Sequence, residues 1–159
     1  MKTILIASDH AGFELKQALI PYIQDMGFDV KDFGAHEFLE DDDYPDYIAP
    51  LAKEISENDG IQQAIVIGGS GQGEAMVANR FRHVRAVVFN GQYHPASGQT
   101  VPLEVKTARE HNDANVLSLG ARFLTVSDAK EAVKTFLTTP FSEEKRHIRR
   151  LRKLDELSK

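Results

Sequence analysis

The chain has 159 residues, of which 42% are hydrophobic and 27% charged, a composition typical of one ordinary globular domain and not of a disordered chain. It contains no cysteine, which excludes disulfides, thiolate metal sites and cysteine nucleophiles. The net charge of -5 is uneven, since residues 145–159 carry seven Lys/Arg against two Asp/Glu and residues 1–144 carry twelve against twenty-two. An acidic body of this kind argues against a nucleic-acid partner. Because no apolar run approaches about 20 residues, we expect a soluble, cytoplasmic protein with no membrane partner.

Short apolar runs alternate along the chain with segments of helical periodicity. The apolar runs predict five strands, over residues 3–7, 28–33, 64–67, 84–89 and 115–119. The periodic segments predict helices over residues 12–26, 47–55, 74–81, 103–111 and 127–137, the last with Ser127 as its N-cap. This alternation indicates a single α/β domain over residues 1–159, with a five-stranded parallel sheet that helices cover on both faces. Residues 90–102, broken by two Pro and two Gly, read as a long surface loop.

The C-terminal segment, residues 143–157, predicts a strongly charged helix with a narrow apolar stripe. Apolar side chains recur there every three residues, at Ile148, Leu151, Leu154 and Leu157. Such a helix either packs on its own domain or docks on a second subunit. We favour docking, because the stripe is narrow and terminal.

Ligands of parallel α/β sheets bind beyond the carboxyl ends of the strands. We expect three polar segments to lie there, at residues 8–12, 68–74 and 109–115. The second has glycine at 68, 69, 71 and 73, which lets backbone N–H groups converge on a phosphate or an oxyanion, although a tight structural turn is the simpler alternative. The run lacks the Lys-Ser/Thr of a nucleotide-triphosphate loop and the spacing of a dinucleotide loop. Glu74 follows the glycines directly and is either a general base or a plain helix-capping acid.

Other polar residues supply weaker signals. His10 beside Asp9 is either a phosphate-binding cation or an ordinary residue at a helix start. His111-Asn112 places an acid/base next to an amide donor. Arg146 and Arg150 are four residues apart, so they share a helix face that either grips a phosphate or is simply solvated. We see no metal-ligand spacing among the histidines and expect no metal.

Six motifs and the C-terminal basic run together resemble the type B ribose-5-phosphate isomerases and the related galactose-6-phosphate isomerase subunits. They are the segments 7–16 (ASDHAGFELK), 43–45 (DYP), 68–74 (GGSGQGE), 78–80 (ANR), 109–112 (REHN), 120–122 (GAR) and 146–150 (RHIRR). They follow the order of that family along nearly the whole chain. The resemblance implies a Rossmann-like three-layer α/β/α sandwich, dimers or pairs of dimers with shared active sites, and no metal or organic cofactor.

The resemblance also implies aldose–ketose isomerisation of a phosphorylated sugar through a cis-enediolate, most simply ribose 5-phosphate to ribulose 5-phosphate. Where one subgroup carries a cysteine base at the start of the glycine-rich turn, this chain has Gly68, so it resembles the subgroup in which the base is the Glu after the turn, here Glu74. His111 would open the sugar ring. The implied substrate-binding residues are Asp9, His10, Gly69, Ser70, Gly71, Gln72, Gly73, Asn112, Arg122, Arg146 and Arg150, with the Ser70 hydroxyl also assisting the chemistry.

One departure from the family concerns residues 91–102, which add about a dozen residues between the fourth strand and the helix that leads to His111. We expect this loop near the rim of the site, where it either selects the substrate or serves an interface. A hexose, deoxy- or tetrose-phosphate therefore stays open as the substrate. A non-catalytic sugar-phosphate-binding subunit is the alternative from another class, but it would need the arginines and no base. A nucleic-acid binder rests on the basic end alone.

Overall fold

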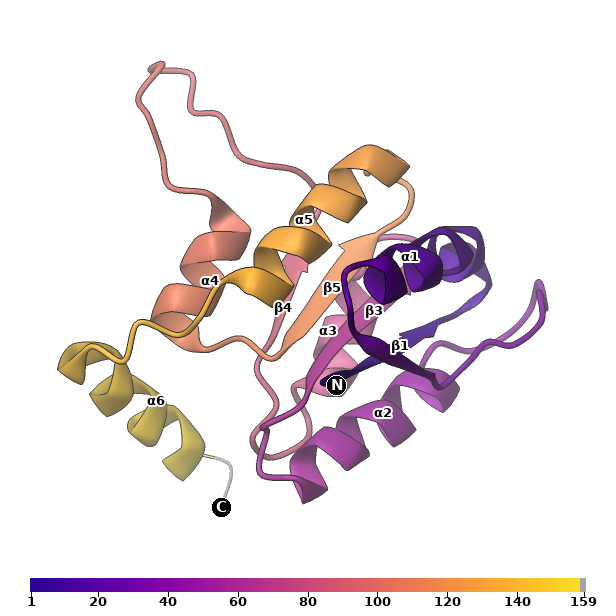
Figure 1. Ribbon diagram of the computed structural model, residues 1–159, viewed down its shortest axis with the longest axis horizontal. Helices are drawn as coiled ribbons and strands as arrows, with labels where there is room; N and C mark the ends of the chain where they lie inside the picture. Colours follow the sequence, from indigo (N-terminus) through magenta and orange to yellow (C-terminus); the bar gives the residue numbers. More distant parts are fainter. Residues whose placement is uncertain (158–159) are drawn as a thin grey trace.

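The computed structural model describes residues 1–157 and has one five-stranded parallel sheet at its centre (Figure 1). The strand order across the sheet is β2-β1-β3-β5-β4. The strands are β1 (Thr3–Ser8), β2 (Asp29–Asp32), β3 (Gln63–Gly68), β4 (Ala86–Phe89) and β5 (Val116–Gly120). All four neighbouring pairs are parallel. The five predicted strands are confirmed, each to within two residues at either end.

Helices cover both faces of the sheet, as the sequence predicted. Because side chains alternate along a strand, Ile4 and Ile6 of β1 face one core and Leu5 and Ala7 face the other. The first core is covered by α1 (Phe13–Asp25), α4 (Glu104–Asn112) and α5 (Val126–Thr138). The second is covered by α2 (Pro45–Glu57) and α3 (Gln72–Ala78). The three-layer α/β/α sandwich is therefore confirmed.

The start of α5 differs from the prediction. Its N-cap is Thr125 and not Ser127, since the Thr125 hydroxyl accepts a hydrogen bond from the Asp128 backbone N–H at 3.1 Å. The Asp128 carboxylate in turn accepts the Thr125 backbone N–H, which completes a capping box. The reciprocal pair satisfies two N–H groups, whereas Ser127 lies inside the first turn. The helix consequently begins at Val126.

A buried lysine ties α1 to the end of β2. Lys16 is fully buried, and its ammonium donates to both carboxylate oxygens of Asp32, at 2.7 and 2.8 Å, and to the Ala35 carbonyl at 2.7 Å. Asp32 also accepts the Gly34 backbone N–H at 2.9 Å. The segment held in this way continues the sheet beside Ser8, through reciprocal backbone bonds of 2.7 Å. The ion pair therefore shapes the chain next to the carboxyl end of β1.

Two segments stand apart from the sandwich (Figure 1). Helix α6 (Lys145–Glu156) confirms the predicted C-terminal helix and packs against α4. Its stripe is only partly covered, since Leu154 and Leu157 remain 47% and 83% exposed. The loop of residues 91–102 extends from the body as an exposed connection, as predicted. Within residues 1–157, no helix has the length and apolar character needed to cross a lipid bilayer.

Removing the carboxylate of Asp32 should strongly destabilise the protein. In Asp32→Ala the buried Lys16 ammonium loses its counter-ion, so we expect the free energy of unfolding to fall by about 3 kcal/mol. Urea denaturation measures this change. The control is Glu57→Ala, which breaks an exposed pair with Lys53 and should cost less than about 1 kcal/mol. Equal losses in the two variants would contradict the role given to the buried pair.

Candidate active site

Three loops converge at the carboxyl edge of the sheet. Ser8 pairs with Ile67, and Gly68 pairs with Gly120, so β1, β3 and β5 end side by side. A hollow of about 180 Å³ opens between the loops that follow these strands. Its lining residues are Asp9, His10, Ala11, Tyr44, Gly69, Ser70, Gly73, Glu74 and Arg122. The structure thus brings together the first two predicted segments with Arg122.

The turn after β3, residues 68–73, is held open by its neighbours. Gly71 has a φ of 73°, a left-handed conformation that favours glycine. The Ser118 hydroxyl donates to the Gly71 carbonyl at 2.6 Å, and the Asn90 amide donates to the Ser70 carbonyl at 2.9 Å. Within residues 1–157, the backbone N–H groups of Ser70 and Gly71 have no hydrogen-bond partner. The turn can therefore offer N–H donors to an oxyanion.

The Glu74 carboxylate lies against the backbone of Gly68. It occupies the place where a Cβ at position 68 would stand, so any side chain there would displace it. Glu74 is only 4% exposed. Burial raises the pKa of its carboxyl group, the negative charge of Asp9 adds to this, and the backbone N–H of Glu74 acts in the opposite direction. A buried carboxylate with a raised pKa beside an N–H turn has the properties of a general base.

Arg122 and Tyr44 pack against the backbone of the turn from two sides. The Arg122 guanidinium lies 3.0 Å from where a Cβ on Gly69 would stand, and the Tyr44 phenol lies 2.6 Å from where a Cβ on Gly73 would stand. Glycine at these two positions lets both side chains approach the backbone. Tyr44 was quoted in the DYP motif but was not predicted as a site residue, because nothing in the sequence places the end of the acidic loop over the turn.

A second residue missed by the sequence analysis is Asp42. One of its oxygens accepts hydrogen bonds from the His10 backbone N–H at 3.0 Å and from His10 Nδ1 at 2.6 Å. Asp9, His10 and Asp42 also offer potential metal-ligand atoms within 4.8 Å of one another, a grouping that histidine spacing alone did not indicate. Their relation crosses 32 positions of the chain, so no local pattern carries it.

The third predicted segment lies elsewhere, and the expectation that it shares the carboxyl edge is wrong. Residues 109–115 lead into β5, so they lie at its amino end, about 16 Å from Gly120 along the strand. His111 and Asn112 are exposed there at the end of α4. The His111 ring stacks on His147 of α6, with centroids 4.4 Å apart, and Arg146 and Arg150 are exposed on the same helix. Within one chain, these four predicted residues do not meet Glu74.

Burial lowers the pKa of the His147 imidazole, the nearby His111, Arg146 and Arg150 lower it further, and Glu144 acts in the opposite direction. The His147 ring is 1% exposed and shares a 2.8 Å hydrogen bond with the Ser142 hydroxyl. This second group of residues is therefore an exposed basic surface beside one buried histidine, in which Arg146 donates to the Glu144 carboxylate at 2.8 Å. It is suited to a phosphate.

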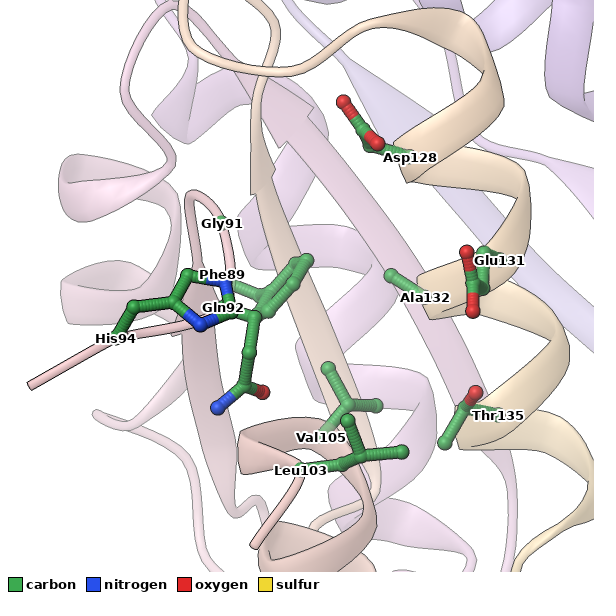
Figure 2. A pocket seen from close by; sticks show the side chains of 10 residues that line it. All are labelled: Phe89, Gly91, Gln92, His94, Leu103, Val105, Asp128, Glu131, Ala132 and Thr135. Atoms are coloured by element: carbon green, nitrogen blue, oxygen red, sulfur yellow. The ribbon is translucent and has the colours of Figure 1, made fainter. Parts of the chain in front are cut away.

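The loop of residues 91–102 does not line the hollow that contains Glu74. Figure 2 shows instead a separate cavity of about 310 Å³ between this loop and α5. Apolar Phe89, Leu103 and Val105 lie on one side of it, and Asp128 and Glu131 on the other. At its root, Asn90 donates to the Ser70 carbonyl, and further along the loop Gln92, Tyr93 and Pro102 border a second hollow together with Asn112. In one chain, then, the loop lies beside Asn112 and not beside Glu74.

Comparison with known proteins shows the family of this chain. The family model described as Ribose/Galactose Isomerase matches residues 4–154. The chain belongs to the ribose/galactose isomerase family. It is 39% identical over 149 residues to ribose-5-phosphate isomerase B of Mycolicibacterium paratuberculosis, covering 93% of this chain and 86% of that protein.

Solved structures of the ribose/galactose isomerase family share the fold. Ribose-5-phosphate isomerase B from Mycoplasma genitalium, with bound ribulose-5-phosphate, superposes with a TM-score of 0.86 at 34% identity and covers 98% of this chain and 95% of its own. A ribose 5-phosphate isomerase from Thermotoga maritima gives a TM-score of 0.82 at 39% identity, with 98% of each chain covered. The family resemblance and the Rossmann-like fold expected from the sequence are confirmed.

The raised pKa of Glu74 can be tested directly. Because Asp9 contributes to the shift, Asp9→Asn should lower the pKa of the Glu74 carboxyl group while leaving it above that of an exposed glutamate. Titration of the ¹³C-labelled glutamate carboxyls by NMR, with Glu74→Gln used to assign the signal, measures both values. Asp29→Asn, an exposed change on β2, is the control. A Glu74 that titrates like the exposed glutamates would contradict the burial argument.

Proposed function

We propose that this chain interconverts ribose 5-phosphate and ribulose 5-phosphate, with Glu74 as the base. The observation that carries the proposal is the buried Glu74 carboxylate, seated against Gly68 beside the unpaired N–H groups of the turn. Relatives named ribose-5-phosphate isomerase B match over most of the chain, and one was solved with ribulose-5-phosphate bound. We place the activity in the cytoplasm.

The reaction moves one proton between adjacent carbons. After ring opening, the Glu74 carboxylate removes the proton from C2, the electron pair forms a C1–C2 double bond, and the charge develops on the C1 oxygen. Glu74 then returns the proton to C1, while the C2 hydroxyl proton passes to the C1 oxygen and C2 becomes the carbonyl carbon. The turn N–H groups and the Ser70 hydroxyl stabilise the developing oxyanion. Burial shifts the pKa of the Glu74 carboxyl group upward, toward neutral pH. A group that acts first as a base and then as an acid works best when its pKa is near the working pH.

The sugar phosphate is held from two sides. His10, Asp9 and Arg122 border the hollow that contains Glu74. A second copy of the chain supplies the other residues. They are His111, which opens the sugar ring, Asn112, Arg146 and Arg150. The separation of the two groups in one chain supports this arrangement, because a β-strand's length lies between them. The partly uncovered apolar stripe of α6 supports docking of that helix on the second copy. The enzyme is accordingly a homodimer, or a pair of dimers, with shared active sites.

The identity of the sugar is tested separately from the chemistry. A panel of C4 to C6 aldose phosphates, assayed for ketose formation, tests it, with the highest kcat/KM expected for ribose 5-phosphate. Preference for a hexose phosphate would assign another substrate to the same chemistry. Binding of a sugar phosphate without turnover would instead indicate a non-catalytic binding subunit, a role that needs neither Glu74 nor His111.

Replacing Glu74 by Gln should keep the shape of the site and remove proton transfer. We expect kcat to fall by about 10²-fold or more, with a much smaller change in KM. Steady-state kinetics with ribose 5-phosphate measure both. The control is Glu57→Gln on the exposed side of α2. A Glu74→Gln enzyme with near-normal turnover would mean that another group is the base.

Two inactive variants should complement each other if the site is shared. In a hybrid of Glu74→Gln and Arg146→Ala/Arg150→Ala subunits, one of the two sites keeps both Glu74 and the arginines. After co-refolding, statistical mixing should restore about a quarter of the wild-type rate. Each variant refolded alone is the control. Absence of recovery in verified hybrids would contradict a site that combines Glu74 of one subunit with the arginines of the other.

A further inference from the structure

We propose that Asp42 is a positioning residue that holds the His10 ring so that its Nε2 serves the sugar phosphate. This inference rests on the proposed function, in which His10 borders the substrate. Asp42 belongs to the acidic loop of residues 37–43, which precedes α2 and has no part in the reaction described above.

The contact is doubled on one oxygen. Asp42 Oδ1 accepts the His10 backbone N–H at 3.0 Å and the His10 ring at Nδ1 at 2.6 Å. The bond to the backbone N–H fixes the position of the His10 main chain, and the bond to Nδ1 fixes the orientation of the imidazole ring. The Asp42 side chain is 5% exposed and that of His10 is 30% exposed. A short bond to a nearly buried carboxylate is a strong restraint on a side chain at the edge of a hollow.

An aromatic contact supports the same orientation. The Phe38 ring, from the same acidic loop, meets His10 edge-on, with centroids 6.3 Å apart and planes at 89°. Phe38 also packs edge-on against Phe13 of α1 at 6.3 Å. The loop therefore contacts the His10 ring through one charged and one aromatic side chain, and α1 supports the aromatic one.

The pairing also decides which nitrogen is available. Since the Nδ1 proton is donated to Asp42, only Nε2 remains for a ligand in the hollow. When the ring is protonated, Nε2 carries a proton that can be donated to a phosphate. The hydrogen bond to Asp42 is the largest influence on the pKa of His10 and raises it; Asp9 acts in the same direction, and burial and Arg122 act against it. Asp42 thus extends the pH range over which His10 is a cation.

The groups around the Asp42 side chain are consistent with this role. Its second oxygen, Oδ2, is buried, and the Tyr47 phenol of α2 faces Asp42. Burial raises the pKa of this phenol, and the charge of Asp42 and a side-chain hydrogen bond to Asp42 raise it further. The two close contacts of Asp42 Oδ1 both go to His10, as expected of a residue that positions the His10 ring.

The test compares Asp42→Asn with Asp41→Asn. The amide that Asp42→Asn introduces retains an oxygen that can accept both hydrogen bonds, so only the negative charge is lost. The exposed neighbour Asp41 loses the same charge without touching His10. Histidine rings labelled with ¹³C and ¹⁵N are titrated by NMR, and His10→Gln identifies the signals. In the wild type, the neutral His10 ring should carry its proton on Nδ1, and only Asp42→Asn should lower the His10 pKa.

The same variants are assayed with ribose 5-phosphate across the pH range. For Asp42→Asn we expect the alkaline limb of kcat/KM to move to lower pH and KM at neutral pH to rise on the order of 10-fold, with kcat changing far less. A loss of folding alone would change kcat and the melting temperature without moving the limb. Equal pH profiles and equal His10 pKa values in the two variants, or a neutral His10 protonated on Nε2 in the wild type, would overturn the proposal.

The outcome separates this inference from the proposed function. If the wild type does not isomerise ribose 5-phosphate, the function fails, but the NMR titration, repeated with inorganic phosphate as the probe, still tests Asp42. Phosphate should then raise the His10 pKa in the wild type and do so less in Asp42→Asn. If the wild type is an isomerase and Asp42→Asn behaves as Asp41→Asn, the positioning role alone is wrong.

Discussion

The close approach of the Glu74 carboxylate to the Gly68 backbone is the constraint on which the rest of the site depends. Glycine at 68 leaves the space that the carboxylate fills, and the helix α3 that follows the turn presents Glu74 back toward it. The turn must therefore do two things, which are to admit the carboxylate and to leave N–H groups free beside it. Ser118 in β5 and Asn90 after β4 donate to two carbonyls of the turn and so maintain that geometry.

The same constraint relates this chain to the other subgroup that the resemblance brings in. There the base is a cysteine at the start of the turn, the position of Gly68. The Glu74 carboxylate fills the space in which a side chain at position 68 would begin, so any side chain there would have to displace it.

The sequence predicted those parts of the site that are local in the chain. The glycines and Glu74 lie within seven residues, so their spacing predicted a turn of backbone N–H groups beside a carboxylate, whereas the choice of Glu74 as the base came from the family resemblance. Asp42 and Tyr44 were not predicted as site residues. They belong to a part of the chain that lies about 30 positions in sequence from the residues they contact, so no local pattern indicates the contact. The error over residues 109–115 had a different cause. A segment that precedes a strand lies at the strand's amino end, so adjacency to β5 placed His111 opposite Glu74 and not beside it.

The measurement that tests this account most directly is the turnover of Gly68→Ala. The backbone at Gly68 is not left-handed, so alanine is compatible with it, and the added methyl should simply push the Glu74 carboxylate away. The account predicts a folded protein whose kcat with ribose 5-phosphate is lower by about 10²-fold or more. The control is Gln99→Ala, an exposed change in the loop of residues 91–102, which should retain its activity. A Gly68→Ala enzyme with wild-type kcat would contradict the central claim that the carboxylate seated at Gly68 performs the proton transfer.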